Sequence, residues 1–140
     1  MLLGFKKQFA PKILDGSKKF TIRNPRKREP KIGATLHMYT GLRTKNTEVI
    51  SKEHTLKGIQ LVDIYINIDA KTEGYMDIKV DGRLLHFNEH PEFVKADGFE
   101  KTTDFATYWM KSIGFKNRET DTWEVSVTDL IMYHWTDLRF

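Results

Sequence analysis

The sequence lacks cysteine and has no long apolar run. Without cysteine, the 140-residue chain can form no disulfide, no thiolate metal site and no cysteine nucleophile. No segment approaches the roughly 18 consecutive apolar residues that a membrane-spanning helix needs. At the N-terminus a very short apolar piece precedes Lys6 and Lys7, which is the reverse of the charge order in a secretory signal peptide. These absences predict a cytoplasmic protein that does not cross a membrane.

The chain also has no internal repeat and no segment with the composition of a linker. Its content of 39% hydrophobic and 12% aromatic residues is that of an ordinary folded domain and excludes a disordered tail. A length of 140 residues suits one domain with a sizeable core. We therefore predict a single domain over residues 1–140.

Acidic residues are scarce in the first part of the chain. Residues 1–57 contain 14 lysines and arginines against 4 aspartates and glutamates, whereas residues 58–140 contain 9 basic and 15 acidic residues. The net charge of +4 thus conceals a strongly basic first part, which indicates one basic face. Such a face is typical of proteins whose partner carries phosphates. The alternative, that the lysines only keep the surface soluble, stays open at this point.

The stretch from Phe9 to Arg23 predicts a short helix followed by a strand. Pro11 suits the first turn of a helix, where a missing N–H costs nothing, and Gly16 suits the left-handed residue that ends one. Side chains alternate between the two faces of the strand that follows. Phe20 and Ile22 are therefore expected to point into the core.

The opposite face of this strand carries Lys19, Thr21 and Arg23, and Lys18 lies at the turn before it. This composition is unusual for a purely structural strand, but it suits a site that binds an anion. We therefore expect these four side chains to form the floor of a binding cleft.

Two basic loops, 24–33 and 41–46, leave neighbouring strand ends and are expected to form the rim of this cleft. Tyr39 or Phe99 could stack on an unpaired base, as recognition of single-stranded RNA requires, although Phe99 is the more typical core residue. The side chains expected to bind the ligand are Lys18, Lys19, Thr21, Arg23, Arg26, Lys27, Arg28, Tyr39, Arg43 and Lys45.

The remaining segments predict more strand than helix, and hence an α+β domain. Strands are expected over 35–40, 57–69, 75–80, 83–87 and 123–135, and helices over 92–97 and from Thr102, which would cap its helix. The apolar pattern changes phase near Val62, which predicts a bulge. An Asp-Gly pair at 81–82 predicts a hairpin over 75–87 with a type I′ turn. Trp109 and Trp123 lie on apolar stripes and are expected in the core.

The segment 13–23, with its Gly-x-Lys-x-x-Thr-Ile-Arg core, resembles the signature of the ASCH domain. A Lys-x-Gly piece at 31–33, the basic piece at 39–45 and an Asp-Gly-Phe segment at 97–99 extend the resemblance over most of the chain. The hairpin at 75–87 is a candidate insertion. The resemblance implies a partly closed β-barrel of the PUA-like superfamily, with a short N-terminal helix and further helices before the last strand.

The same resemblance implies a cleft, lined by this motif, that binds RNA or a modified nucleoside. One bacterial branch of the family is similar to a small amidohydrolase that removes the acetyl group of N4-acetylcytidine. Carried over to this chain, Lys18 matches its base, Thr21 its nucleophile and Arg23 the arginine beside them. Asp97 matches its acid, where that branch has a glutamate and therefore a longer reach.

Binding of RNA or a nucleoside is therefore the main expectation, and amide hydrolysis by Lys18, Thr21 and Asp97 is the alternative. A protein-interaction module for an acidic partner is a third interpretation. His86 and His90, with a glutamate between them, could bind a metal only on one continuous helix, which the predicted hairpin argues against. No metal or cofactor is expected, and the oligomeric state stays open.

Overall fold

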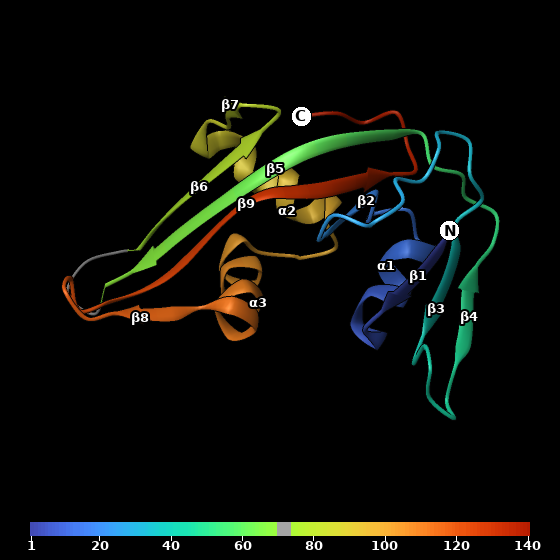
Figure 1. Cartoon of the computed structure of the whole chain (residues 1–140), viewed down its shortest axis with the longest axis horizontal. Helices are drawn as coiled ribbons and strands as arrows, with labels where there is room; N and C mark the ends of the chain where they lie inside the picture. Colours follow the sequence, from blue (N-terminus) through green and yellow to red (C-terminus); the bar gives the residue numbers. More distant parts are fainter. Residues whose placement is uncertain (70–73) are drawn as a thin grey trace.

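The fold is α+β, as the sequence predicts. The computed structural model describes residues 1–69 and 74–140 and contains two sheets and three short α-helices (Figure 1). The first sheet has the order β1–β3–β4, with β1 (Leu2–Phe5), β3 (His37–Thr40) and β4 (Glu48–Ser51). Within the described residues, the two sheets are not closed into a barrel.

The second sheet is built around the long antiparallel pair β5 and β9. Its order is β2–β9–β5–β6–β7, and β8 pairs with β9 outside this path. The strands are β2 (Phe20–Arg23), β5 (Gly58–Ile68), β6 (Tyr75–Val80), β7 (Arg83–Leu84), β8 (Phe115–Asn117) and β9 (Thr122–His134). One end of this pair extends with β6 and β8 away from the first sheet, while the other end reaches β2 (Figure 1).

The helices are short and lie beside the sheets. They are α1 (Ala10–Leu14), α2 (His90–Ala96) and α3 (Thr102–Ile113), with single 3₁₀ turns η1 (Lys7–Phe9) and η2 (Phe87–Glu89) before α1 and α2. The predicted start and end signals of the first helix are confirmed, because Pro11 lies in the first turn of α1 and Gly16 follows the helix with φ 83°. Thr102 does not cap α3: it is the first helical residue, and Lys101 precedes it without a capping side-chain bond.

The predicted hairpin is confirmed, but its second strand ends at Leu84 rather than at residue 87. β6 and β7 pair around Asp81 and Gly82, whose φ angles of 50° and 81° are both positive, as a type I′ turn requires. The Asp81 carboxylate also accepts hydrogen bonds from Leu61 N and Gln60 Nε2, at 2.9 and 3.0 Å. The turn is thereby joined to the neighbouring strand.

The predicted bulge lies on the partner strand rather than on β5. The β5–β9 register shifts between Val62 and Ile64, but the extra residue belongs to β9, where Asp129 has φ 57°. Asp63 Oδ1 accepts a hydrogen bond of 2.8 Å from Asp129 N. β5 therefore keeps one phase throughout, and Leu61 is 46% exposed, contrary to the phase change that its apolar pattern predicts.

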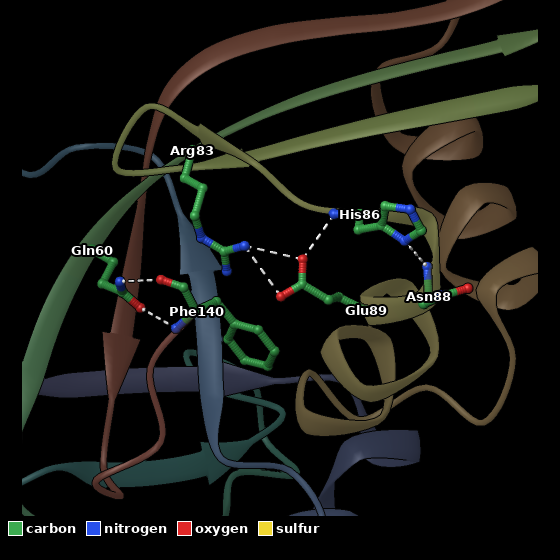
Figure 2. Close-up of polar contacts among 6 residues, drawn as sticks. All are labelled: Gln60, Arg83, His86, Asn88, Glu89 and Phe140. Carbon is green, nitrogen blue, oxygen red and sulfur yellow. Dashed lines mark hydrogen bonds and ion pairs between the residues drawn. The ribbon is translucent and has the colours of Figure 1, made fainter.

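A buried glutamine explains why that phase is kept. Gln60 Nε2 donates to Phe140 O at 2.9 Å, and Gln60 Oε1 accepts from Phe140 N at 3.1 Å (Figure 2). These bonds satisfy the Gln60 amide in the interior. The centre of the Phe140 ring lies 5.1 Å from the centre of the Phe93 ring and 5.9 Å from that of the Phe20 ring. Phe20 is fully buried, as predicted.

The prediction that Trp123 is buried is wrong. Trp123 is 49% exposed, because β9 places it at the outer end of the long pair, opposite Ile68 and Lys116. Trp109 is half-buried against the core, and its ring lies 6.2 Å from that of Phe105, which is completely buried.

Candidate functional site

A cavity of about 580 Å³ lies where β1, η1, β2 and the turn after α2 meet. Its polar lining comprises Lys18, Thr21, Arg23 and Asp97, together with Lys6 and Lys7. Its aromatic lining comprises Phe5, Phe9, Phe99, Tyr108 and Trp109. The motif that carries the ASCH resemblance thus faces a cavity with aromatic walls.

Lys18 and Asp97, which are 79 residues apart in the sequence, form a buried pair. Lys18 Nζ lies 2.8 Å from Asp97 Oδ1 and also donates to the main-chain oxygen of Asp97. The two residues are only 2% and 5% exposed. Lys18 Nζ also lies 4.8 Å from the centre of the Phe9 ring, so the ammonium faces an aromatic surface.

The backbone around Gly98 brings the two side chains together. Gly98 follows α2 with φ 96°, a conformation in which most other residues are strained. A Cβ at this position would lie 3.0 Å from Lys18 Cδ and 3.0 Å from Phe9 Cδ1. On the other side of the pair, Lys19 N donates to Ala96 O at 2.6 Å, which ties the start of β2 to the end of α2.

Burial favours the neutral form of both partners. It lowers the pKa of the Lys18 ammonium, with Asp97 opposing this shift and Arg23 adding to it. Burial raises the pKa of the Asp97 carboxyl, and the nearby Lys18 opposes that shift. An amine beside a carboxylic acid holds the same number of protons as the ion pair. The pair can therefore present a base and an acid without exchanging a proton with water.

Thr21 and Arg23 extend from the same strand into this cavity. Arg23 Nε donates to Thr21 Oγ1 at 3.1 Å, and Arg23 Nη2 donates to Gly4 O at 2.7 Å. The Arg23 guanidinium lies 4.9 Å from the centre of the Phe5 ring. Thr21 is 5% exposed and accepts the arginine bond, so its own hydroxyl proton stays available to a base.

Several predicted binding residues lie elsewhere. Lys19 lines a different depression, beside Glu92 and Lys95. From the loop 41–46, only Gly41 and Leu42 reach the cavity. Five of the predicted binding residues are exposed and do not line the cavity: Arg26, Lys27, Arg28, Arg43 and Lys45.

Two of the outlying residues have contacts of their own. Arg26 Nη2 donates to Leu2 O at 2.8 Å. Tyr39 lies on the face of β3 opposite the buried Met38 and Thr40, and the Lys52 ammonium is 5.7 Å from its ring. The structure therefore places the motif residues Lys18, Thr21 and Arg23 in the cavity and the basic side chains of the two loops outside its lining.

Tyr108 and Trp109 belong to the site but were not predicted there. Both rings line the cavity, and Trp109 Nε1 is a buried donor without a partner among the described residues. Tyr108 lies one helical turn after Phe105, so the helical spacing of α3 could have indicated that it faces inward. No local pattern marks Lys6 and Lys7 as part of the site.

The histidine pair does not form a metal site within the described residues. His86 Nδ1 accepts from Asn88 N at 3.3 Å, and the Glu89 carboxylate accepts from His86 N and from Arg83 (Figure 2). These bonds cap η2. In residues 1–69 and 74–140, no group of three or more His, Asp, Glu or Cys side chains could hold a metal ion.

In comparisons with known proteins, no family model, no curated protein and no solved structure matches the chain. Across the described part of the chain, no helix has the length and apolar content needed to span a membrane.

Proposed function

We propose that the cavity binds the base of a nucleoside, either free or within RNA. The observation that supports this most directly is a cationic and hydroxyl-bearing floor enclosed by aromatic rings. Lys18, Thr21 and Arg23 supply polar contacts, while the half-buried ring of Tyr108 supplies a surface on which a base could stack. Phe99, at 6% exposure, belongs to the core behind it. A volume of about 580 Å³ lies in the range of small-molecule sites.

The family assignment is part of this proposal. The ASCH-like motif residues Lys18, Thr21 and Arg23 all line the cavity, as a ligand-binding motif should. We propose that the two open sheets correspond to the partly closed PUA-like barrel and that the hairpin at 75–87 is an insertion. A cytoplasmic location and RNA contacts from the loops 24–33 and 41–46 belong to the same proposal.

Calorimetric titration tests the binding proposal. Cytidine, N4-acetylcytidine and a short single-stranded RNA are titrated into the wild type and Tyr108→Ala. Tyr75→Ala is the matched control, because Tyr75 is 56% exposed and does not line this cavity. We expect at least one ligand to bind the wild type and the control equally and Tyr108→Ala at least tenfold more weakly. Binding of none of the three ligands would contradict the proposal. Binding of an acidic peptide in their place would also contradict it.

Amide hydrolysis is a second candidate, favoured by the buried pair of Lys18 and Asp97 in the cavity that Thr21 also lines. The neutral Lys18 amine would take the proton of the Thr21 hydroxyl as Thr21 Oγ1 attacks the acyl carbon of N4-acetylcytidine. Arg23 would stabilise the developing oxyanion. The carbon–nitrogen bond would then break as the Asp97 carboxyl donates its proton to the departing exocyclic nitrogen of cytidine.

Water completes the cycle in this scheme. A water molecule attacks the acetyl ester on Thr21 and transfers one proton to the Asp97 carboxylate. The carbon–oxygen bond to Thr21 breaks, and its oxygen recovers a proton from the Lys18 ammonium. Acetic acid leaves, and the starting protonation states are restored.

Chromatography of N4-acetylcytidine incubated with the protein tests this candidate. Cytidine should appear with the wild type, at a reduced rate with Thr21→Ser, which keeps a hydroxyl, and not with Thr21→Ala. No cytidine at high protein concentration would exclude hydrolysis and leave binding as the function. Equal turnover by Thr21→Ala would remove Thr21 as the nucleophile.

A further inference from the structure

A second cavity adjoins the first and shares part of its wall. It has a volume of about 620 Å³ and lies between the η1–α1 segment and α3. Lys6, Phe99 and Tyr108 line both cavities. The two cavities are therefore neighbours on either side of these three side chains.

The second cavity carries more positive than negative charge. Three lysines line it, Lys6, Lys12 and Lys111, against the two carboxylates Glu100 and Asp104. Lys12 Nζ lies 3.2 Å from Glu100 Oε1, so these two charges offset each other. Lys6 and Lys111 form no ion pair with any carboxylate of residues 1–69 and 74–140, and their charges remain available to an anion.

The shared wall combines a cation with an aromatic platform. Lys6 Nζ lies 4.8 Å from the centre of the Tyr108 ring. The Tyr108 ring packs edge-on against the rings of Phe99 and Phe9, with ring centres 5.3 and 5.9 Å apart. These neighbouring rings hold its orientation. Proteins that bind single strands combine cations along the backbone with rings on which successive bases stack.

We infer that the ligand is a nucleic acid strand of at least two nucleotides rather than a free nucleoside. One base occupies the first cavity, the linking phosphate lies at Lys6, and the adjoining nucleotide occupies the second cavity within reach of Lys111. This inference rests on the proposed function, because it places the first base beside Lys18, Thr21 and Arg23. A free nucleoside would leave the second cavity and its unpaired Lys111 without a role.

Comparison of a nucleoside with a dinucleotide tests the inference. Cytidine and the dinucleotide cytidylyl-cytidine are titrated into the wild type, Lys111→Glu and Lys79→Glu at several salt concentrations. Lys79 is the matched control because it is an exposed lysine on β6 that lines neither cavity. We expect the dinucleotide to bind the wild type at least tenfold more tightly than cytidine.

The salt dependence and the variants identify the source of this gain. The logarithm of the dinucleotide association constant should fall with log salt with a slope of about −0.7 for each phosphate contacted, and that of cytidine should not change. Lys111→Glu should weaken dinucleotide binding at least threefold without changing cytidine binding, and Lys79→Glu should change neither.

The failures of the two proposals are distinguishable. Equal affinity of cytidine and the dinucleotide would overturn the strand inference and leave nucleoside binding intact. The strand inference would also be overturned if the dinucleotide binds more tightly than cytidine but Lys111→Glu changes the affinity of neither ligand. Binding of neither molecule to the wild type would overturn the proposed function itself.

Discussion

Removal of one member of the Lys18–Asp97 pair should destabilise the protein far more than removal of both. The single variants Lys18→Met and Asp97→Leu each leave one ionisable group buried without its partner. In the wild type the two groups are 2.8 Å apart and the two residues are at most 5% exposed, so the remaining group is poorly solvated when its partner is removed. The perturbation therefore isolates a buried interaction on which the geometry of the cavity depends.

The expected magnitude follows from opposing contributions. In the ion-pair form, at 2.8 Å and an effective dielectric constant of about 20, the attraction between the two charges is roughly 6 kcal/mol. Desolvation costs several kcal/mol for each ion, so the complete pair contributes little net stability. Loss of one partner should cost about 3–5 kcal/mol. The double variant should lose only about 1–3 kcal/mol, because the Asp97 carbonyl loses the donor that Lys18 supplied.

Urea unfolding followed by circular dichroism measures these free energies in a double-mutant cycle. With the values above, the coupling energy should be at least about 3 kcal/mol in magnitude. The exposed pair of Lys12 and Glu100 is the matched control, since Lys12→Met should cost less than about 1 kcal/mol. The coupling energy of the buried pair should also change little at high salt, because buried charges are poorly screened.

Two results would refute this reasoning. Single variants that each cost less than about 1 kcal/mol would mean that the pair is solvated in solution. A double variant that loses the sum of the two single losses would mean that Lys18 and Asp97 act independently, and a proton could not then be held between them.

Three further predictions concern the core, the turn and the basic loop. Phe20→Ala should cost about 3–5 kcal/mol in urea unfolding, because Phe20 is completely buried; a negligible loss would contradict its core position. Gly98→Ala should destabilise the protein by at least about 1 kcal/mol, because φ is 96° and the new methyl group would press on Lys18; equal stability would show that this turn is unstrained. Charge reversal at Arg26, Lys27 and Arg28 should weaken RNA binding and reduce its salt dependence without unfolding the protein; unchanged affinity would remove the loop 24–33 from the interface.

A fourth prediction concerns pH. Burial lowers the pKa of His134 to about 4, so the folded protein holds this side chain neutral while the unfolded chain takes up a proton below about pH 6.5. Stability should therefore fall as pH decreases from about 6.5 to about 4, by at most about 1.4 kcal/mol per pH unit from this group. His134→Gln should remove this part of the pH dependence, as measured by urea unfolding at pH 7, 5.5 and 4.5. An unchanged slope would show that His134 is accessible to protons in the folded state.

Local features of the fold could be predicted from the sequence because short-range physics decides them. Pro11 and Gly16 delimit α1, and the Asp-Gly pair at 81–82 forms the expected turn, since each depends on the φ preference of one or two residues. The alternation that places Phe20 in the core and Thr21 on the opposite face follows from the strand period. The same period puts Thr21 and Arg23 on one face, but it also puts Lys19 there, which lines a different depression, while Lys18 comes from the turn before the strand.

Long-range packing determines which side chains are exposed at two positions where the sequence pattern predicts burial. The apolar pattern of β5 predicts a buried Leu61, but the amide of Gln60 finds its partners in Phe140, 80 residues away, and this keeps the other face inside. Trp123 is exposed because it lies at the outer end of the β5–β9 pair. Nothing in its own segment indicates where the sheet extends beyond its neighbours, so this exposure could not be predicted.

The candidate site shows the same division. The sequence by itself determined that a basic, hydroxyl-bearing motif lies on one strand face, and the family resemblance indicated Asp97. Only the tertiary structure buries Lys18 against Asp97, adds the rings of Tyr108 and Trp109, and leaves the basic side chains of the two loops outside the cavity. The physical reason is that a pKa shift, an aromatic wall and a cavity depend on which distant residues exclude water from a group, and sequence spacing does not encode that exclusion.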